Sequence, residues 1–246
     1  MRSEGGVTHM TPDASRSERP GLADLGLALM ALAAGSTDAT AFLKLGMVFT
    51  SAMTGNTVLL CIAIGQGQLS AALQSFAAFA SFMVGASLAA LLCGRRPPPA
   101  VAAPSLVPLF VLEIACLAAF VAVWFALDRT RDGTTYGLIA LSALAMGVQG
   151  VTARQINVPQ VNTIVFTTTI INVVVSLVHG LVRAPRRVPF DTRRQIGILL
   201  VYATGAVVAG LSIHREDGIY VWVPLLAVIA AFACCEAGRR SMARPG

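Results

Sequence analysis

Long apolar stretches, separated by short polar or arginine-rich segments, occupy almost the whole chain. A bilayer core about 30 Å thick needs roughly 20 mostly apolar residues in a helix to cross it. By that measure the pattern predicts eight transmembrane helices, over 22–42, 47–65, 72–93, 104–127, 135–153, 162–182, 195–213 and 219–236. We therefore expect an all-α, polytopic transmembrane helix bundle of about eight spans.

The alternative count is six spans, because the eight stretches differ in quality. The third, fourth, seventh and eighth are continuously apolar, whereas polar residues interrupt the other four. Interrupted stretches have low mean hydropathy in a sliding window, which is how such helices are normally found.

The composition agrees with a membrane protein. The chain has 246 residues, of which 56% are hydrophobic and 12% charged, whereas soluble domains have about 25% charged residues. The net charge of +6 does not indicate a nucleic-acid partner, because the basic residues lie between apolar stretches and not on one amphipathic face. We expect the lipid bilayer as partner, and leave homo-oligomerisation open.

The distribution of basic residues predicts the orientation, since cytoplasmic segments of membrane proteins are rich in Lys and Arg. With eight spans and the N-terminus inside, thirteen of the 18 basic residues are cytoplasmic. Arg95 and Arg96 then fall outside, which is the weak point of this count. We expect a bacterial inner-membrane protein with both termini in the cytoplasm. Residues 1–20 lack an apolar core, which predicts a disordered cytoplasmic tail and no cleavable signal peptide, and 239–246 form a second cytoplasmic tail.

Two stretches, 35–58 and 147–170, depart from the apolar pattern in the same way. Both combine glycine with threonine and other polar residues, and aligning Gly35 with Gly147 also aligns Thr40 with Thr152. Around the third and seventh spans, YATGAVVAGL resembles FMVGASLAAL. This predicts an internal repeat, with transmembrane halves at 21–128 and 129–238. Halves of four spans would point the same way, and halves of three would be inverted.

The two stretches also supply the candidate site. Transporters often bind solute near the bilayer midplane, between repeats and at discontinuous helices. Glycine and proline permit such unwinding, and we expect Thr50, Thr54 and Thr57 to form one polar stripe on the second span. The alternative is helix packing, in which small residues let helices approach and Thr bonds its own helix. The predicted substrate- or ion-binding residues are Thr37, Asp38, Thr54, Gly55, Asn56, Gln149, Thr163 and Thr167.

Of the carboxylates within the predicted spans, two are candidates for proton coupling. A charged side chain at the bilayer centre costs about 2.5–3.5 kcal/mol on insertion scales, so such groups are paired, protonated or functional. Asp38 is the first, although Lys44 lies only six residues on and interfacial placement is the alternative. Glu113 is the second, and could equally be a neutral acid bonded to a carbonyl.

The motif from Asp38 to Val58, D-A-x-x-F-L-x-L-G-x-V-F-T-x-x-M-T-G-N-T-V, resembles a signature of the YoaK family. The motif from Ala145 to Pro159, A-M-G-V-Q-G-V-T-A-R-Q-I-x-V-P, is also similar to that family. One departure is that Thr167 precedes Thr168 where the family usually has a T-G pair. The resemblance implies a polytopic bacterial inner-membrane protein of a family with no established biochemical activity.

These observations predict a secondary transporter or permease for a small polar solute or ion. The alternatives are a passive channel and a structural or accessory membrane protein without transport activity. We expect no enzyme, because the chain has no H-E-x-x-H, no G-x-S-x-G and only scattered histidines. The five cysteines lack metal-ligand spacing. We therefore predict no catalytic residues, metal or cofactor.

Overall fold

The computed structural model describes residues 21–93, 106–127, 132–156, 166–183, 190–212 and 218–242. The predicted tail 1–20 and residues 243–246 lie outside this part. The described elements are helices, in chain order: α1 (Leu22–Lys44), α2 (Met53–Gly65), α3 (Leu69–Cys93), α4 (Val107–Ala126), α5 (Asp132–Gln155), α6 (Phe166–Arg183), α7 (Phe190–Ser212), the 3₁₀ turn η1 (Ile219–Val221) and α8 (Trp222–Met242).

Within the described ranges, six helices are long and apolar enough to cross a membrane, namely α1, α3, α4, α5, α7 and α8. The second and sixth predicted spans are the exceptions. Helix α2 has 13 residues because residues 45–52 before it are not helical. The apolar part of α6 is also short, at Thr169–Val178. The fold is therefore a polytopic helical bundle with about six spans, the second of the two predicted counts.

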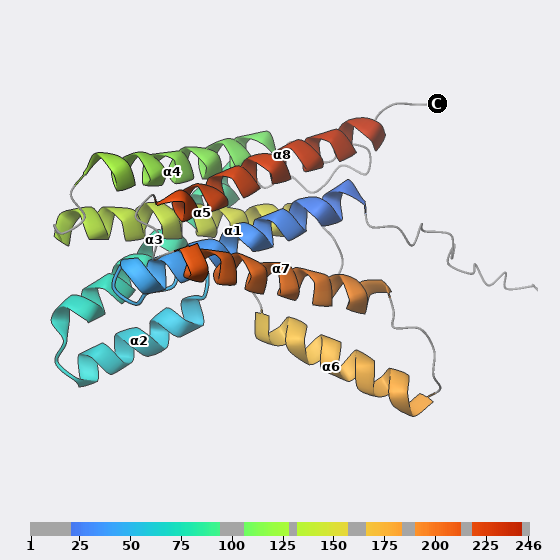
Figure 1. The fold of residues 1–246 in the computed structure, drawn as a ribbon, viewed down its shortest axis with the longest axis horizontal. Coiled ribbons are helices and arrows are strands. Elements are labelled where there is room, and N and C mark those ends of the chain that lie inside the picture. The colour runs from blue at the N-terminus through green and yellow to red at the C-terminus, as the bar shows by residue number, and fades with distance from the viewer. Residues whose placement is uncertain are drawn as a thin grey trace, which may run out of the picture.

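The six long helices run alternately up and down the long axis of the bundle (Figure 1). Helix α1 packs against α7 and α8, and α5 packs against α3 and α4, so α1 and α5 occupy the interior. The short α2 lies against α3, and α6 lies against α7. The start of α1 and the end of α8 lie at the same end of the bundle (Figure 1), which we call the terminal end.

Two pairs of long helices approach each other closely, and each approach depends on a glycine from both partners. A Cβ at Gly35 of α1 would overlap the Tyr202 carbonyl of α7, and a Cβ at Gly205 would overlap the Leu32 carbonyl of α1. Small residues at such crossings let membrane helices pack backbone to backbone.

The second close approach joins α3 and α5. A Cβ at Gly85 would overlap the Leu144 carbonyl, and a Cβ at Gly147 would overlap the Phe82 carbonyl. Because no larger side chain fits at these four positions, the two crossings fix how the central helices pack.

The interior between these helices is apolar and aromatic. Phe110, Phe120 and Trp124 of α4 are buried, and Trp124 meets Tyr220 edge to face with ring centroids 5.9 Å apart. The outward faces carry exposed apolar residues, as expected for helices in contact with lipid. The polar groups that are buried among these apolar side chains are therefore the natural place to look for a site.

Candidate functional site

The polar centre of the first half is built where α1 ends and the chain turns back into the bundle. Gly46 and Met47 both have positive φ, at 93° and 61°, so the chain turns sharply there. This conformation is easy for glycine and unfavourable for methionine. Residues 45–52 then run back alongside α1 before α2 begins at Met53. We call residues 45–52 the return loop.

Asp38 of α1 binds the return loop with both carboxylate oxygens. Its Oδ1 accepts hydrogen bonds from the Thr50 amide (2.6 Å), the Thr50 hydroxyl (2.9 Å) and the Ser51 amide (2.7 Å). Its Oδ2 accepts one from the Ser51 hydroxyl (2.5 Å). Asp38 is only 3% exposed. Because α2 begins two residues after Ser51, the carboxylate also lies near the positive end of that helix.

Tyr202 of α7 completes the set of donors. Its hydroxyl donates to Asp38 Oδ2 at 2.7 Å, across 164 residues of sequence. The Gly35–Gly205 crossing makes this contact possible, because Tyr202 lies one turn from Gly205 and Asp38 one turn from Gly35. Five hydrogen bonds thus converge on the two oxygens of one carboxyl group. We call Asp38, Thr50, Ser51 and Tyr202 the Asp38 network.

Asn56 and Gly55 shape the return loop from its other side. The Asn56 Oδ1 accepts from the Phe49 amide at 2.8 Å, and the Asn56 Nδ2 donates to the Phe49 carbonyl at 2.5 Å. A Cβ at Gly55 would lie 2.9 Å from Cδ2 of the Phe49 ring. Asn56 therefore satisfies loop backbone groups that no helix or strand pairs, as a buried loop requires.

Three other predicted site residues make no hydrogen bond to this network, namely Thr37, Thr54 and Gln149. Thr37 donates to the Ala33 carbonyl of its own helix at 2.6 Å. Thr54 is exposed on α2. Gln149 is buried on α5 and donates from Nε2 to the Met30 carbonyl of α1 at 2.9 Å. Thr163 and the Thr167 side chain lie outside the described part.

The threonine stripe predicted on the second span is wrong. Thr50 belongs to the return loop, and α2 begins only at Met53, so these residues do not share one helix. Thr50 faces Asp38, whereas Thr57 is exposed and donates to the Met53 carbonyl. The spacing i, i+4, i+7 predicts a shared face only within a continuous helix.

Sequence reasoning missed Ser51 and Tyr202. Ser51 lies inside the motif with no feature to distinguish it from its neighbours. Tyr202 did have a signal, because it begins the YATGAVVAGL segment that resembles FMVGASLAAL, where its counterpart is Phe82. Tyr202 differs from Phe82 only by its hydroxyl group. Because this group lies beside a close helix crossing, it suggests a polar contact across that crossing.

Glu113, the other predicted carboxylate, has a very different environment. It is fully buried on α4, and neither carboxylate oxygen has a hydrogen-bond partner among the described residues. It lies six residues, less than two helical turns, after the start of α4 at Val107. The two carboxylates are therefore opposites, one saturated with donors and the other with none.

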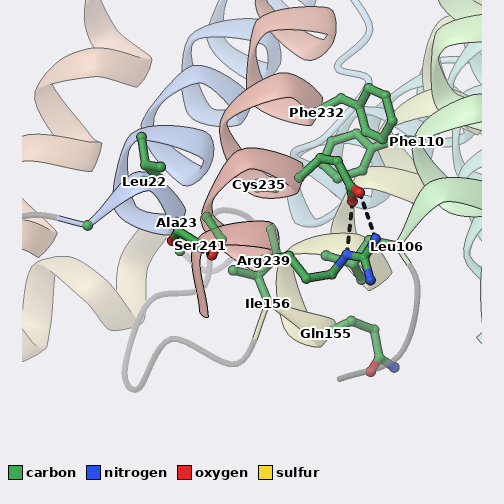
Figure 2. Close-up of a pocket in the computed structure, with 13 residues that line it drawn as sticks. Leu22, Ala23, Leu106, Phe110, Gln155, Ile156, Phe232, Cys235, Arg239 and Ser241 are labelled. Carbon is green, nitrogen blue, oxygen red and sulfur yellow. Dashed lines mark hydrogen bonds and ion pairs between the residues drawn. The ribbon is translucent and has the colours of Figure 1, made fainter. Parts of the chain in front are cut away.

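A cavity of about 370 Å³ opens at the terminal end of the bundle, among α1, α4, α5 and α8. Figure 2 shows Phe110 and Phe232 at its inner side, with ring centroids 5.4 Å apart. Arg239 and Glu236 lie at its outer side, joined by an ion pair of 2.6 Å. A second cavity, of about 600 Å³, lies between α1 and α7 at the same end and includes Arg193 and Arg194.

Known proteins place the chain in a family without supplying an activity. It is 30% identical over 206 residues to UPF0700 transmembrane protein YoaK of Bacillus subtilis (strain 168). The aligned region covers 82% of this chain and 89% of that protein. No solved structure matches it. The model of the family described as "Protein of unknown function (DUF1275)" matches residues 26–234. The chain therefore belongs to the DUF1275 family of membrane proteins, as its two motifs indicated.

Proposed function

We propose that this protein is a secondary transporter or permease for a small polar solute. The observation that carries the proposal is the return loop, a non-helical segment inside a membrane bundle followed by a half-length helix. Such backbone is tolerated at membrane depth only where protein, water or ligand satisfies it. Discontinuous helices of this kind form the solute sites of many secondary transporters.

The two halves of the chain are proposed to be inverted repeats. The reciprocal glycine crossings support this. A shift of 112 residues carries Leu32 and Gly35 of α1 onto Leu144 and Gly147 of α5. A shift of 120 residues carries Phe82 and Gly85 of α3 onto Tyr202 and Gly205 of α7. The Gly35–Tyr202 contact therefore corresponds to the Gly147–Phe82 contact. In the same way, the Gly205–Leu32 contact corresponds to the Gly85–Leu144 contact.

Two further features support the inverted arrangement. Helix α4 begins with Val-Pro-Leu at residues 107–109, and the same three residues occur at 223–225, directly after the first residue of α8, Trp222. Each half also contributes three long helices, so the second half starts from the opposite side of the membrane. In Figure 1, α1 and α5 run in opposite directions along the bundle.

We propose that the terminal end faces the cytoplasm of a bacterial inner membrane. With six spans, fourteen basic residues fall on the side of the termini, including Arg95 and Arg96, which the eight-span count placed outside. The other four are Lys44, Arg129, Arg131 and Arg215. The six-span count thus gives a stronger positive-inside asymmetry than the eight-span count.

The Asp38 network would act as the joint between the halves. Asp38 and the return loop belong to the first half and Tyr202 to the second, so relative motion of the halves must strain or break the Asp38–Tyr202 bond. Solute bound at the return loop would compete for the same donors. Movement of one repeat against the other around such a site is how alternating access is usually achieved.

A ligand screen on the purified protein tests this proposal. Wild type and Asp38→Asn are heated in detergent with a library of ions and small metabolites, and the hits are tested for uptake into proteoliposomes. A ligand at a hundred times its Kd adds about 2.7 kcal/mol. We expect a solute that stabilises wild type and is taken up, with both effects lost in Asp38→Asn.

The matched control is Asp24→Asn, which removes a carboxylate from the same helix at its cytoplasmic end, where it pairs with Arg194 at 3.4 Å. This variant should keep both ligand stabilisation and uptake. Absence of any stabilising solute and of any uptake, with both proteins folded, would contradict a transport function.

A passive channel is the second candidate, and the saturation of Asp38 favours it. Five donors already surround this carboxylate, so it has little capacity left for a coupling ion. Solute flux that ignores both the proton and the sodium gradient would support the channel and contradict coupled transport.

A further inference from the structure

Glu113 combines complete burial with the lack of any partner. Its carboxylate oxygens receive no hydrogen bond from the described residues, and its exposed fraction is zero. An ionised carboxylate in such a position is strongly unfavourable, and the usual outcome is that the group takes up a proton and becomes neutral. A neutral carboxylic acid is a donor as well as an acceptor, and needs no counter-ion.

The helices packed around α4 offer no charge to compensate Glu113. Helix α3 has no Asp, Glu, Lys, Arg or His, and its one titratable group is Cys93 at its end. On α5, Asp132, Tyr136 and Arg154 lie in the outer turns, far along the helix from its centre. On α8, the titratable groups are the neighbouring Cys234, Cys235, Glu236, Arg239 and Arg240, all in the last three turns. The nearest titratable group on α4 itself is Cys116, one turn deeper.

The terminal cavity reaches Phe110, which lies less than one turn before Glu113 on α4. Phe110 lines the cavity, and Glu113 follows it by three residues, which places it about 4.5 Å farther along α4 and on nearly the same face. The rings of Phe110 and Phe232 form the inner side of the cavity (Figure 2). Rotation of these two rings is therefore the step that would admit water to Glu113.

We propose that Glu113 is a proton-binding site, protonated in the conformation seen here, that exchanges its proton with the terminal side of the membrane through this cavity. The proton site stands on the geometry of α4 and the cavity. Its coupling to solute movement rests on the proposed function. Under this proposal Glu113 is the coupling group, and Asp38 holds the two halves and the return loop together.

A hydrophobic carbodiimide tests the proton site directly, because it reacts with protonated carboxyl groups in apolar surroundings. The acid adds across a C=N bond of the reagent, its proton passes to nitrogen, and rearrangement leaves a stable acylurea on the side chain. Labelling of the wild-type protein is followed by peptide mass spectrometry at several pH values. Asp38 and Glu236 serve as internal controls, since donors surround both carboxylates.

We expect Glu113 to be labelled and the two controls to remain unlabelled at neutral pH. At high pH the labelling should fall by about tenfold for each pH unit, because only the protonated form reacts. Phe232→Ala should speed the labelling by widening the route. An unlabelled Glu113 at every pH, or labelling of Asp38 in its place, would overturn the proposal.

Infrared spectroscopy gives a second, independent measurement. The C=O band of a protonated carboxylic acid should be present in wild type and in Asp38→Asn, shift in D₂O, and disappear in Glu113→Gln. Its persistence in Glu113→Gln would overturn the assignment. If Glu113 is labelled but no solute is taken up, the proton site stands and the transport function is contradicted. If uptake is coupled to protons but Glu113 is not labelled, the transport function stands and the proton site is contradicted.

Discussion

The two close helix crossings have the same packing and different chemistry. At the α1–α7 crossing, Gly35 and Gly205 let the backbones touch, and at the α3–α5 crossing Gly85 and Gly147 do the same. The first crossing carries Asp38, a buried carboxylate with five donors. In the inverted repeat proposed above, the position that corresponds to Asp38 is Gly150.

The residues that face these positions from the partner helices, α7 and α3, also differ, with a polar side chain at the first crossing and an apolar one at the second. Tyr202, which donates to Asp38, corresponds to Phe82 on α3. The close approach of two helices therefore does not require a charge, since the α3–α5 crossing achieves it without one. Asp38 serves a different purpose, which is to hold the return loop and to connect it to α7. The following predictions separate the packing shared by the crossings from the chemistry found at only one.

The largest effect is expected for Asp38→Ala, which removes the acceptor of all five hydrogen bonds. The Thr50 and Ser51 amides, their hydroxyls and the Tyr202 hydroxyl would be left unpaired or would need water. Each buried donor without a partner costs about 1–3 kcal/mol, so the free energy of unfolding should fall by about 3 kcal/mol or more. Denaturation of the purified protein by SDS measures this.

Asp38→Asn should have a smaller effect, because the amide oxygen can still accept from the two backbone amides. Gly150→Ala, at the corresponding position of the second half, is the comparison variant and should change stability by less than Asp38→Ala. Equal losses for Asp38→Ala and Asp38→Asn would show that shape alone, and not hydrogen bonding, determines this site.

The second prediction concerns what the crossings share. Gly35→Ala and Gly147→Ala each add a Cβ that overlaps a carbonyl of the facing helix. Overpacking of this kind typically costs about 1–3 kcal/mol, and the two losses should be similar. Gly137→Ala and Gly210→Ala on α5 and α7 have open space at the Cβ, so they should stay within about 1 kcal/mol of wild type. Unequal losses at Gly35 and Gly147 would contradict the correspondence of the crossings.

The number and position of the long helices show how much of the fold the sequence predicts. Hydropathy predicted the membrane class and located all six long helices, because a membrane span must be apolar over its whole length. The choice between six and eight was not available from hydropathy. Polar residues interrupt α1 and α5 as well as residues 47–65 and 162–182. Only the structure shows that α2 starts late, at Met53, after the turn at Gly46 and Met47.

The site was predictable in outline and not in detail. A carboxylate in an apolar stretch is conspicuous, so Asp38 and Glu113 were found. Their environments depend on contacts between distant segments, such as the Asp38–Tyr202 bond, and a single sequence does not contain that pairing. Thr37 bonds its own helix and not the Asp38 network, and the sequence does not distinguish these two uses of a threonine.

The third prediction tests the one contact of the Asp38 network that joins the two halves. Tyr202→Phe removes a hydrogen bond to a charged group and leaves Asp38 with its four other donors. The expected loss is about 1–2 kcal/mol in the SDS unfolding free energy. Phe82→Tyr, the mirror change at the other crossing, should bring no compensating gain in the double variant. Restoration of wild-type stability by Phe82→Tyr would contradict this view.

The smallest effect is expected for Thr37→Ala, although Thr37 lies next to Asp38 in a stretch that predicts a binding site. Its hydroxyl bonds the Ala33 carbonyl, which already belongs to the backbone ladder of α1, and the side chain contributes packing more than specificity. A hydroxyl that bonds a carbonyl of its own helix adds little to stability, so the loss should stay under about 1 kcal/mol. Solute stabilisation measured in the ligand screen should be unchanged in this variant. A larger loss, or a loss of solute binding with stability intact, would place Thr37 in the site beside Asp38 and would mean that its bond to Ala33 breaks when solute is bound.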